Sequence, residues 1–334
     1  MNPQQQAKNE LVLSRLGIGC WSFGSSVEDY WGAQDQREVE SLVGAALDQG
    51  ITYFDTAEAY NEGRSEEALG RALKGRRSEA IIGSKVWPNH ASPELLRHHC
   101  EASLRRLGTD FIDLYMLHWP LTEFPLQPAM ETLALLKEEG KIRFIGLSNF
   151  GAEQVRQAAA TGVAIATNQL CYNLLSRAIE FEILPECRRL HIGVIAYMPL
   201  QQGLLTGKYH STEELPAMRT RTRHFSGSRP HSRHGEPGAE AEIFTLVETL
   251  RDMSAETRAT LSQMALSWVA NQDGIASTLT GIRNRQQLDE AAAGVSFPLS
   301  VEVLRRMTEL SEEIKQKLGP NADYFQSTAN SRVR

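Results

Sequence analysis

Short apolar segments alternate with longer helix-like segments along most of this chain, and this alternation constrains its fold more than any other feature. Eight segments have the length and β-branched or aliphatic composition of buried strands: Leu16–Gly19, Thr52–Asp55, Ala80–Ser84, Phe111–Leu117, Arg143–Leu147, Ile165–Gln169, Gly193–Tyr197 and Ile275–Thr280. Eight stretches have the apolar spacing of helices: Gln36–Gln49, Ser65–Leu73, Pro93–Leu107, Gln127–Glu139, Ala152–Ala160, Ala178–Leu190, Thr257–Ala270 and Arg285–Ala292. Strands that alternate with helices form a parallel sheet. Eight such units within residues 16–292 predict an α/β fold, a closed (β/α)8 TIM barrel.

An open dinucleotide-binding sheet is the main alternative to the barrel. It would need the pattern G-x-G-x-x-G between a strand and a helix. Here Gly17-Ile18-Gly19 is followed by Cys20, Trp21 and Ser22, so the third glycine is missing. We therefore predict one barrel domain over residues 1–334. A long polar loop insert at 208–240 and an extra helix near 241–253 precede the last strand, and a helix at about 301–317 and a tail complete residues 300–334.

Charge and composition narrow the class of function. The net charge of -6 gives no basic excess for a phosphate backbone, so we expect no nucleic-acid partner. Residues 1–10 lack the apolar core of a signal peptide, and no apolar run approaches the roughly 20 residues of a membrane helix. We expect a cytoplasmic protein with a small-molecule partner and no membrane contact; the sequence leaves a homo-oligomer open.

We also expect no metal site. The four cysteines lie far apart, and no HExxH pattern occurs. The adjacent histidines His98 and His99 cannot share one face of a helix.

Polar side chains stand where the predicted strands end. Residues that close the apolar runs are Asp55, Lys85, His118, Ser148 with Asn149, Asn168 with Gln169, and Tyr197. In a barrel these ends meet on the C-terminal face, where barrel enzymes have their active sites. One polar residue at a strand end is ordinary, but a series of them in consecutive units indicates a site.

Tyr60 follows Asp55 closely enough for the loop to return its phenol over the barrel mouth. A phenol with a pKa near 10 is a poor acid at pH 7 unless its phenolate is stabilised, and the ammonium group of Lys85 could do this. Asp55 would then keep Lys85 charged and oriented. His118 could orient a carbonyl oxygen or help to relay a proton. Taken singly, a structural Lys85–Asp55 ion pair and an exposed Tyr60 explain these residues equally well.

The settings of these four residues resemble a known family. FDTAEAY around Asp55 and Tyr60, GSKVW around Lys85 and LHWP around His118 are similar to the catalytic tetrad of the aldo-keto reductases. GKIRFIGLSNF (140–150), NQLCYN (168–173) and AYMPLQQGLLTGKY (196–209) resemble further segments of that family. The resemblance implies an oxidoreductase that uses NADPH to reduce an aldehyde or ketone, such as a sugar-like carbonyl, to an alcohol.

The resemblance also implies the cofactor contacts. Ser148, Asn149 and Gln169 would hold the nicotinamide carboxamide, Tyr197 would stack on its ring, and Arg283 would bind the 2′-phosphate that distinguishes NADPH from NADH. The full implied set is Gly19, Cys20, Trp21, Asp55, Ser148, Asn149, Gln169, Tyr197, Met198, Pro199, Leu200, Gly203, Leu205, Lys208, Gly281, Arg283, Gln287 and Glu290. The chain departs from the family pattern at Met198 and Ala291, where a serine and an asparagine are usual.

Substrate contacts are expected from five residues near the strand ends: Tyr60, His118, Trp21, Trp31 and Trp87. Tryptophans in such places can instead be core residues. The insert between Lys208 and Glu240 carries five arginines and four histidines. It is either a solvated loop or a lid that closes on the cofactor or substrate.

Two other functions stay open on the sequence. Lys85 could form a Schiff base, as in an aldolase, with Asp55 and Tyr60 as proton shuttles. The chain could also be a cofactor-binding regulatory subunit, because some ion-channel accessory subunits resemble the same family.

Overall fold

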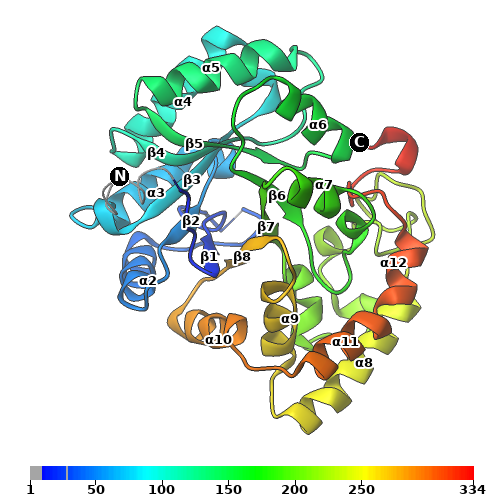
Figure 1. Ribbon diagram of the computed structural model, residues 1–334. Helices are drawn as coiled ribbons and strands as arrows, with labels where there is room; N and C mark the ends of the chain where they lie inside the picture. Colours follow the sequence, from blue (N-terminus) through cyan, green and yellow to red (C-terminus); the bar gives the residue numbers. More distant parts are fainter. Residues whose placement is uncertain (1–9, 28) are drawn as a thin grey trace.

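A closed barrel of eight parallel strands forms the centre of the computed structural model, which describes residues 10–27 and 29–334 (Figure 1). The strands are β1 (Leu16–Gly19), β2 (Tyr53–Asp55), β3 (Ile81–Val86), β4 (Ile112–Leu117), β5 (Ile142–Ser148), β6 (Thr167–Cys171), β7 (Gly193–Tyr197) and β8 (Ile275–Gly281). Each strand pairs with the next, and β8 closes the barrel on β1 with Thr278 opposite Leu16. The prediction of a (β/α)8 barrel is confirmed.

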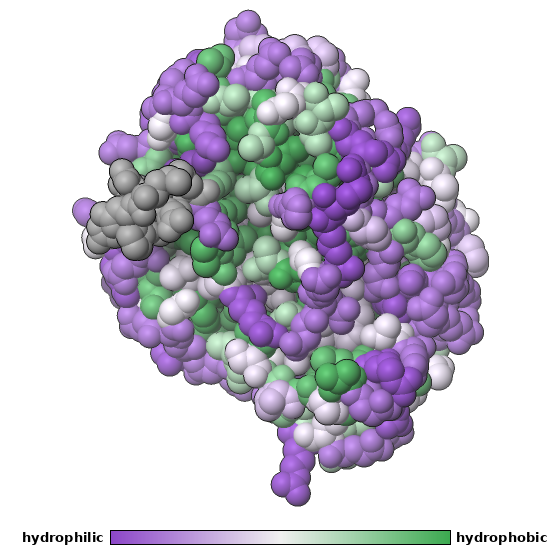
Figure 2. All heavy atoms as spheres, in the orientation of Figure 1, coloured by the Kyte–Doolittle hydropathy of each residue, from purple (hydrophilic) through white to green (hydrophobic). Residues whose placement is uncertain are grey.

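Eight helices surround the strands in Figure 1: α2 (Gln36–Asp48), α3 (Arg64–Ala72), α4 (Pro93–Leu107), α5 (Leu126–Glu138), α6 (Ala152–Ala160), α7 (Ile183–Arg189), α9 (Leu261–Ala270) and α10 (Arg285–Val295). Three more helices lie outside the repeat: α8 (Glu240–Thr257), α11 (Val301–Leu310) and α12 (Glu312–Leu318). Hydrophilic residues predominate along the outline of the molecule, as expected for helices that turn their polar faces outward (Figure 2). Within the described ranges, no helix has both the length and the apolar character needed to cross a bilayer.

Tyr53 fills the inside of the barrel below the strand ends. It is fully buried and packs with Leu114, Met116 and other apolar side chains. Its ring needs two glycines: a Cβ at Gly17 would stand 2.6 Å from the ring, and a Cβ at Gly83 would stand 2.8 Å from the hydroxyl oxygen. The glycines therefore make room for a tyrosine whose hydroxyl group reaches the end of β2.

Three helix predictions were wrong in their bounds. The stretch Ala178–Leu190 is a 3₁₀ turn followed by α7, which begins at Ile183, because Pro185 is tolerated only in the first turn of a helix. The stretch Thr257–Ala270 is divided because Arg258 adopts a left-handed conformation and Thr260 caps α9.

The third wrong prediction is the single helix at 301–317. It is interrupted at Ser311, whose hydroxyl group donates to the carbonyl oxygen of Met307 at 3.0 Å. A serine hydroxyl group that donates to the carbonyl oxygen four residues earlier often bends a helix.

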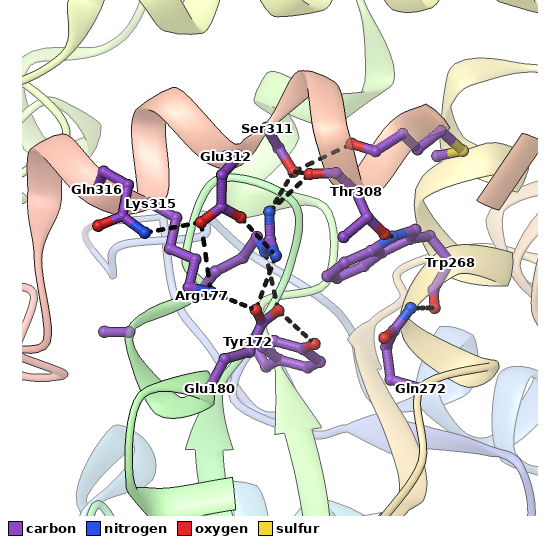
Figure 3. A network of polar contacts seen from close by, with 12 residues as sticks. Tyr172, Arg177, Glu180, Trp268, Gln272, Thr308, Ser311, Glu312, Lys315 and Gln316 are labelled. Atoms are coloured by element: carbon purple, nitrogen blue, oxygen red, sulfur yellow. Dashed lines mark hydrogen bonds and ion pairs between the residues drawn. The ribbon is translucent and has the colours of Figure 1, made fainter. Parts of the chain in front are cut away.

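Arg177 docks the C-terminal helices onto the barrel (Figure 3). Its buried guanidinium group donates to the carbonyl oxygen of Thr308 at 2.8 Å and to Ser311 Oγ at 3.0 Å, and it pairs with Glu180 at 2.7 Å and with Glu312 at 3.1 Å. Because each charge in this network has a partner, burying it need not leave an unsatisfied group.

The insert at 208–240 is packed, although it contains only 3₁₀ turns before α8. The consecutive residues Thr222, Arg223, His224 and Phe225 are buried. Arg223 donates to the carbonyl oxygens of Leu318 and Asn321 at 2.6 and 2.7 Å, which ties the insert to the C-terminal segment. This part of the insert is therefore not a solvated loop, whereas its closure as a lid stays a prediction.

Candidate active site

A cavity of about 1100 Å³ lies at the carboxyl ends of the strands. Strand ends and the loops that follow them supply one part of its wall, including Gly19, Asp55, Ser148, Asn149, Gln169, Tyr197, Thr280 and Gly281. The insert and the C-terminal tail supply another part: Arg219, Arg221, His231, Arg233, Phe325, Gln326 and Arg332. The expectation that the strand ends converge on one site is met by this geometry.

A hydrogen-bonded chain of Asp55, Lys85 and Tyr60 lies at one side of the cavity. Lys85 is fully buried, and its Nζ donates to Asp55 Oδ1 at 2.5 Å, to the carbonyl oxygen of Thr56 at 2.8 Å and to the Tyr60 hydroxyl oxygen at 3.3 Å. Asp55 Oδ2 accepts hydrogen bonds from the Tyr53 hydroxyl group at 2.9 Å and from Gln169 Nε2 at 2.7 Å. Asp55 is thereby held by partners on three strands.

Burial and neighbouring charges set the protonation states of Tyr60 and Lys85. Burial raises the pKa of Tyr60 above 10, and the neighbouring Lys85 ammonium group only partly offsets this. Lys85 acts in the expected direction, because its charge lowers the pKa of Tyr60, but the loss of solvent outweighs this one nearby charge. Burial opposes the charge of Lys85, but Asp55 and Tyr60 raise its pKa overall, so at pH 7 Lys85 is an ammonium ion beside a neutral phenol.

His118 lies beside Tyr60 in the cavity wall. Its ring meets the Tyr60 ring edge-on at a centroid distance of 5.7 Å and the Trp87 ring edge-on at 5.1 Å. Burial, assisted by the charge of Lys85, lowers the pKa of His118 far below 6.5. In the described part of the chain its buried Nδ1 has no hydrogen-bond partner. A neutral imidazole with an unsatisfied nitrogen suits a hydrogen bond to a ligand better than it suits relay through an imidazolium ion.

Aromatic rings form the wall near Tyr60. Trp21 stacks on Tyr60 at a centroid distance of 5.8 Å, and Trp31 meets Trp21 edge-on at 5.7 Å. The tryptophans expected to contact substrate, Trp21, Trp31 and Trp87, all line the cavity. Trp21 and Trp87 are each 37% exposed, which is unusual for core residues and consistent with a ligand-binding surface.

Amide and hydroxyl groups gather at the ends of β5, β6 and β7. Asn149 Oδ1 accepts a hydrogen bond from the Tyr197 hydroxyl group at 2.8 Å, and Asn149 Nδ2 donates to Ser148 Oγ at 3.1 Å. Asn149 and Met198 each follow a strand directly and have positive φ angles of 62° and 57°. Such conformations are uncommon for residues other than glycine and concentrate at functional sites.

Arg283 lines the cavity just after β8. Its guanidinium group donates to the carbonyl oxygen of Trp31 at 2.5 Å and to that of Ala33, which ties the loop after β1 to the loop after β8. Gln287 Oε1 accepts from the Arg283 backbone N–H at 2.9 Å. The nearby Thr280 Oγ1 is buried without a hydrogen-bond partner in the ranges that the structure describes. Amide groups and a guanidinium group in the wall of one cavity fit a nicotinamide dinucleotide.

Most of the expected cofactor contacts line the cavity. Those that do are Gly19, Trp21, Asp55, Ser148, Asn149, Gln169, Tyr197, Met198, Pro199, Leu200, Gly203, Lys208, Gly281, Arg283, Gln287 and Glu290. Cys20 and Leu205 do not, because both side chains are fully buried in the hydrophobic core. Asn168 also faces away: its amide group donates to the carbonyl oxygen of Phe150 at 2.9 Å.

Apart from Lys208, the sequence did not single out by position the residues that the insert and the tail bring to the cavity. Arg221 has no acidic partner among the described residues, and its Nε is buried without a hydrogen bond. Arg332 packs over the ring of Trp119 at 3.6 Å and pairs with Asp323 at 2.7 Å. The basic excess of the insert was a usable signal for Arg221. The position of Arg332 depends on packing of the tail, for which the sequence carries no local motif.

Known proteins share this architecture and much of this sequence. Aldo-keto reductase YhdN of Bacillus subtilis is 35% identical over 94% of this chain and 95% of its own length. The NADH-specific methylglyoxal reductase of Escherichia coli is 32% identical over 92% of this chain and 97% of its own. A crystal structure of an aldo/keto reductase from Klebsiella pneumoniae in complex with NADP and acetate is 28% identical, with a TM-score of 0.70 over 96% of this chain and 95% of that one.

The family model described as Aldo/keto reductase family matches residues 15–312, which include every strand of the barrel and most of the cavity wall. This match covers far more than half of the chain. The chain therefore belongs to the aldo/keto reductase family, as a nicotinamide-dependent oxidoreductase.

Proposed function

We propose that this protein reduces an aldehyde or ketone to an alcohol with NADPH, and that Tyr60 is the proton donor. The hydrogen-bonded chain from Asp55 through Lys85 to Tyr60 carries the proposal, because it places one neutral phenol against one buried ammonium group at the cavity wall. Membership of the family supports the class of reaction.

Each residue of this hydrogen-bonded group has a separate role in the proposed reaction. When bound, the reduced nicotinamide supplies a hydride to the carbonyl carbon. Tyr60 gives its proton to the carbonyl oxygen as negative charge develops there, and Lys85 stabilises the phenolate that remains. Asp55 holds Lys85 in place. The neutral ring of His118 donates a hydrogen bond that orients the carbonyl oxygen.

Ser148, Asn149 and Gln169 would bind the carboxamide of the cofactor, and Tyr197 would stack on the nicotinamide ring. The position and chemistry of Arg283 favour the binding of NADPH over that of NADH. A guanidinium group has five N–H donors, and two carbonyl oxygens occupy only part of them, so donors remain for a 2′-phosphate. The relative from Escherichia coli is named NADH-specific, which makes this preference a point to test.

The proposed substrates are small carbonyl compounds, sugar-like ones included. The exposed faces of Trp21 and Trp87 suit the apolar faces of such molecules, whereas Arg219 and Arg221 offer donors to hydroxyl or anionic groups. The geometry argues against a Schiff base, because the Lys85 ammonium group has three hydrogen-bond acceptors and a raised pKa.

The test is the Tyr60→Phe variant in a screen of aldehydes, ketones and inososes that follows NADPH absorbance. Removing the proton donor should lower kcat by roughly a hundredfold to ten-thousandfold, while the Kd for NADPH changes little. Tyr115→Phe is the matched control, since it removes a phenol hydroxyl that is buried outside the cavity. Full activity of the Tyr60→Phe protein would refute the mechanism. NADPH binding without turnover of any carbonyl would favour the regulatory subunit.

A further inference from the structure

Three metal-ligating side chains converge behind the cavity rather than in it. Glu58 lies in the loop between β2 and Tyr60, His90 ends a 3₁₀ turn after β3, and His99 lies on α4. His90 Nδ1 is 2.8 Å from Glu58 Oε1, and His99 Nδ1 is 2.6 Å from Glu58 Oε2. One ligand atom from each residue lies within 4.8 Å of the others, and none of the three residues lines the cavity.

The carboxylate of Glu58 lacks a permanent counter-charge. Its side chain is only 6% exposed, and in the described part of the chain its ion-pair partners are the two imidazoles and no lysine or arginine. A buried carboxylate is costly unless it is paired. The two imidazole rings stack beside this carboxylate at a centroid distance of 3.7 Å. A single cation bound between the three groups would neutralise the carboxylate.

We propose that Glu58, His90 and His99 form a binding site for Zn²⁺. Two histidines, one carboxylate and a water molecule are a common zinc donor set. Both Nδ1 atoms already face the carboxylate, and the side chains of His90 and His99 are 33% and 23% exposed, which leaves an entry path and room for water. Zinc bonds of roughly 2.0–2.1 Å require the nitrogen–oxygen separations to widen by less than about 1 Å.

The site is coupled to the cavity through Glu58. Glu58 Oε1 also accepts a hydrogen bond from the backbone N–H of Trp87 at 2.8 Å, and the backbone N–H of Glu58 donates to the carbonyl oxygen of Lys85 at 3.3 Å. Trp87 in turn packs against His118. An ion that takes up Oε1 weakens the bond to Trp87 and displaces the wall beside Tyr60. We therefore expect bound Zn²⁺ to lower the rate of carbonyl reduction, an effect that rests on the proposed function, whereas ion binding does not.

The sequence prediction of no metal site depended on local patterns. It considered the pair His98–His99, of which only His99 belongs to the cluster. The three ligands are 32 and 9 residues apart, and the barrel fold alone brings them together.

The binding test is equilibrium dialysis of the full chain against micromolar Zn²⁺ with a thiol-free reductant, followed by metal analysis. We expect one ion per chain, and an affinity at least about tenfold weaker in His90→Gln and in His99→Gln. His98→Gln is the matched control, because it removes a neighbouring imidazole of α4 outside the cluster; its affinity should match the wild type. Failure of the wild type to retain an ion, or equal losses in the control, would overturn the site.

Two further measurements do not depend on the variants. Co²⁺ in the wild-type protein should show visible d–d bands without a thiolate charge-transfer band; such a thiolate band would place the ion on cysteine and overturn the proposal. With a carbonyl substrate, added Zn²⁺ should lower kcat in the wild type and the His98→Gln protein but not in the His99→Gln protein. Zn²⁺ bound at the site with no change in kcat would overturn the coupling alone, and absent turnover in every protein would instead count against the proposed reductase function.

Discussion

Acid should loosen the insert, because His224 is buried as a neutral imidazole. Its Nε2 lies 3.0 Å from the carbonyl oxygen of Leu175 and 3.0 Å from Ser176 Oγ, and its Nδ1 lies 3.1 Å from Gln201 Nε2. Burial lowers the pKa of His224 to about 3. Protonation therefore places a charge where the insert packs against the barrel.

The size of the effect follows from the pKa difference. In the unfolded chain His224 has a pKa near 6.5, so below that pH the unfolded state binds the proton more readily than the folded state. The contribution of neutral His224 to the free energy of unfolding is fully present above about pH 6.5. As the pH falls toward 3, the free energy of unfolding decreases by about 1.4 kcal/mol per pH unit. At pH 4 the loss is about 3 kcal/mol, a large part of the roughly 5–15 kcal/mol typical of a folded protein.

Urea unfolding of the wild type and His224→Gln at pH 7 and pH 4 measures this loss. Glutamine keeps polar groups in the site but does not titrate, so the wild type should lose about 3 kcal/mol more than the variant between the two pH values. His210→Gln, at an exposed position of the same insert, is the control and should behave as the wild type does. Equal pH dependence in the wild type and the His224→Gln protein would refute the reasoning.

Three further predictions concern the cavity. Lys85→Met should lower kcat by roughly a hundredfold to ten-thousandfold, the same range as expected for Tyr60→Phe, because the phenolate of Tyr60 loses its counter-charge. Steady-state kinetics on a variant shown to be folded measures this, and an unchanged kcat would contradict the prediction. The kcat/KM for reduction should show no inflection near pH 6.5, because His118 stays neutral and the raised pKa of Tyr60 keeps its phenol protonated. An inflection near pH 6.5 in the pH profile of kcat/KM would contradict these charge states. Arg283→Ala should weaken NADPH binding by roughly tenfold to a hundredfold, measured by fluorescence titration, and NADH binding by less; equal losses would show that Arg283 acts only by tying the loops together.

The sequence was sufficient to predict those parts of the site whose positions the barrel topology determines. Asp55 and Lys85 lie at the ends of β2 and β3, and His118 directly follows β4; parallel strands in a closed barrel bring these ends to one face whatever the details of packing. The position of Tyr60 could be predicted from the short loop that separates it from Asp55.

Features that depend on long-range packing could not be read in the same way. The pKa of Tyr60 depends on how completely its surroundings exclude water, and the contribution of Arg221 depends on how the insert folds back. Glu58 comes from a loop and its two histidines from other units, so no spacing in the sequence marks them as a group. The cytoplasmic location stays a prediction, and a homo-oligomer stays an open possibility.

The division of the cavity wall has a consequence for protein engineering. Strand ends and the loops that follow them carry the groups proposed for catalysis. Another part of the wall comes from the insert and the tail, which Arg223 links through the carbonyl oxygens of Leu318 and Asn321. Libraries that randomise Arg219, Arg221 and Phe325 therefore alter this part of the cavity wall without changing Tyr60, the proposed proton donor. Arg223 should be kept constant in such libraries, because it anchors the two variable segments to each other.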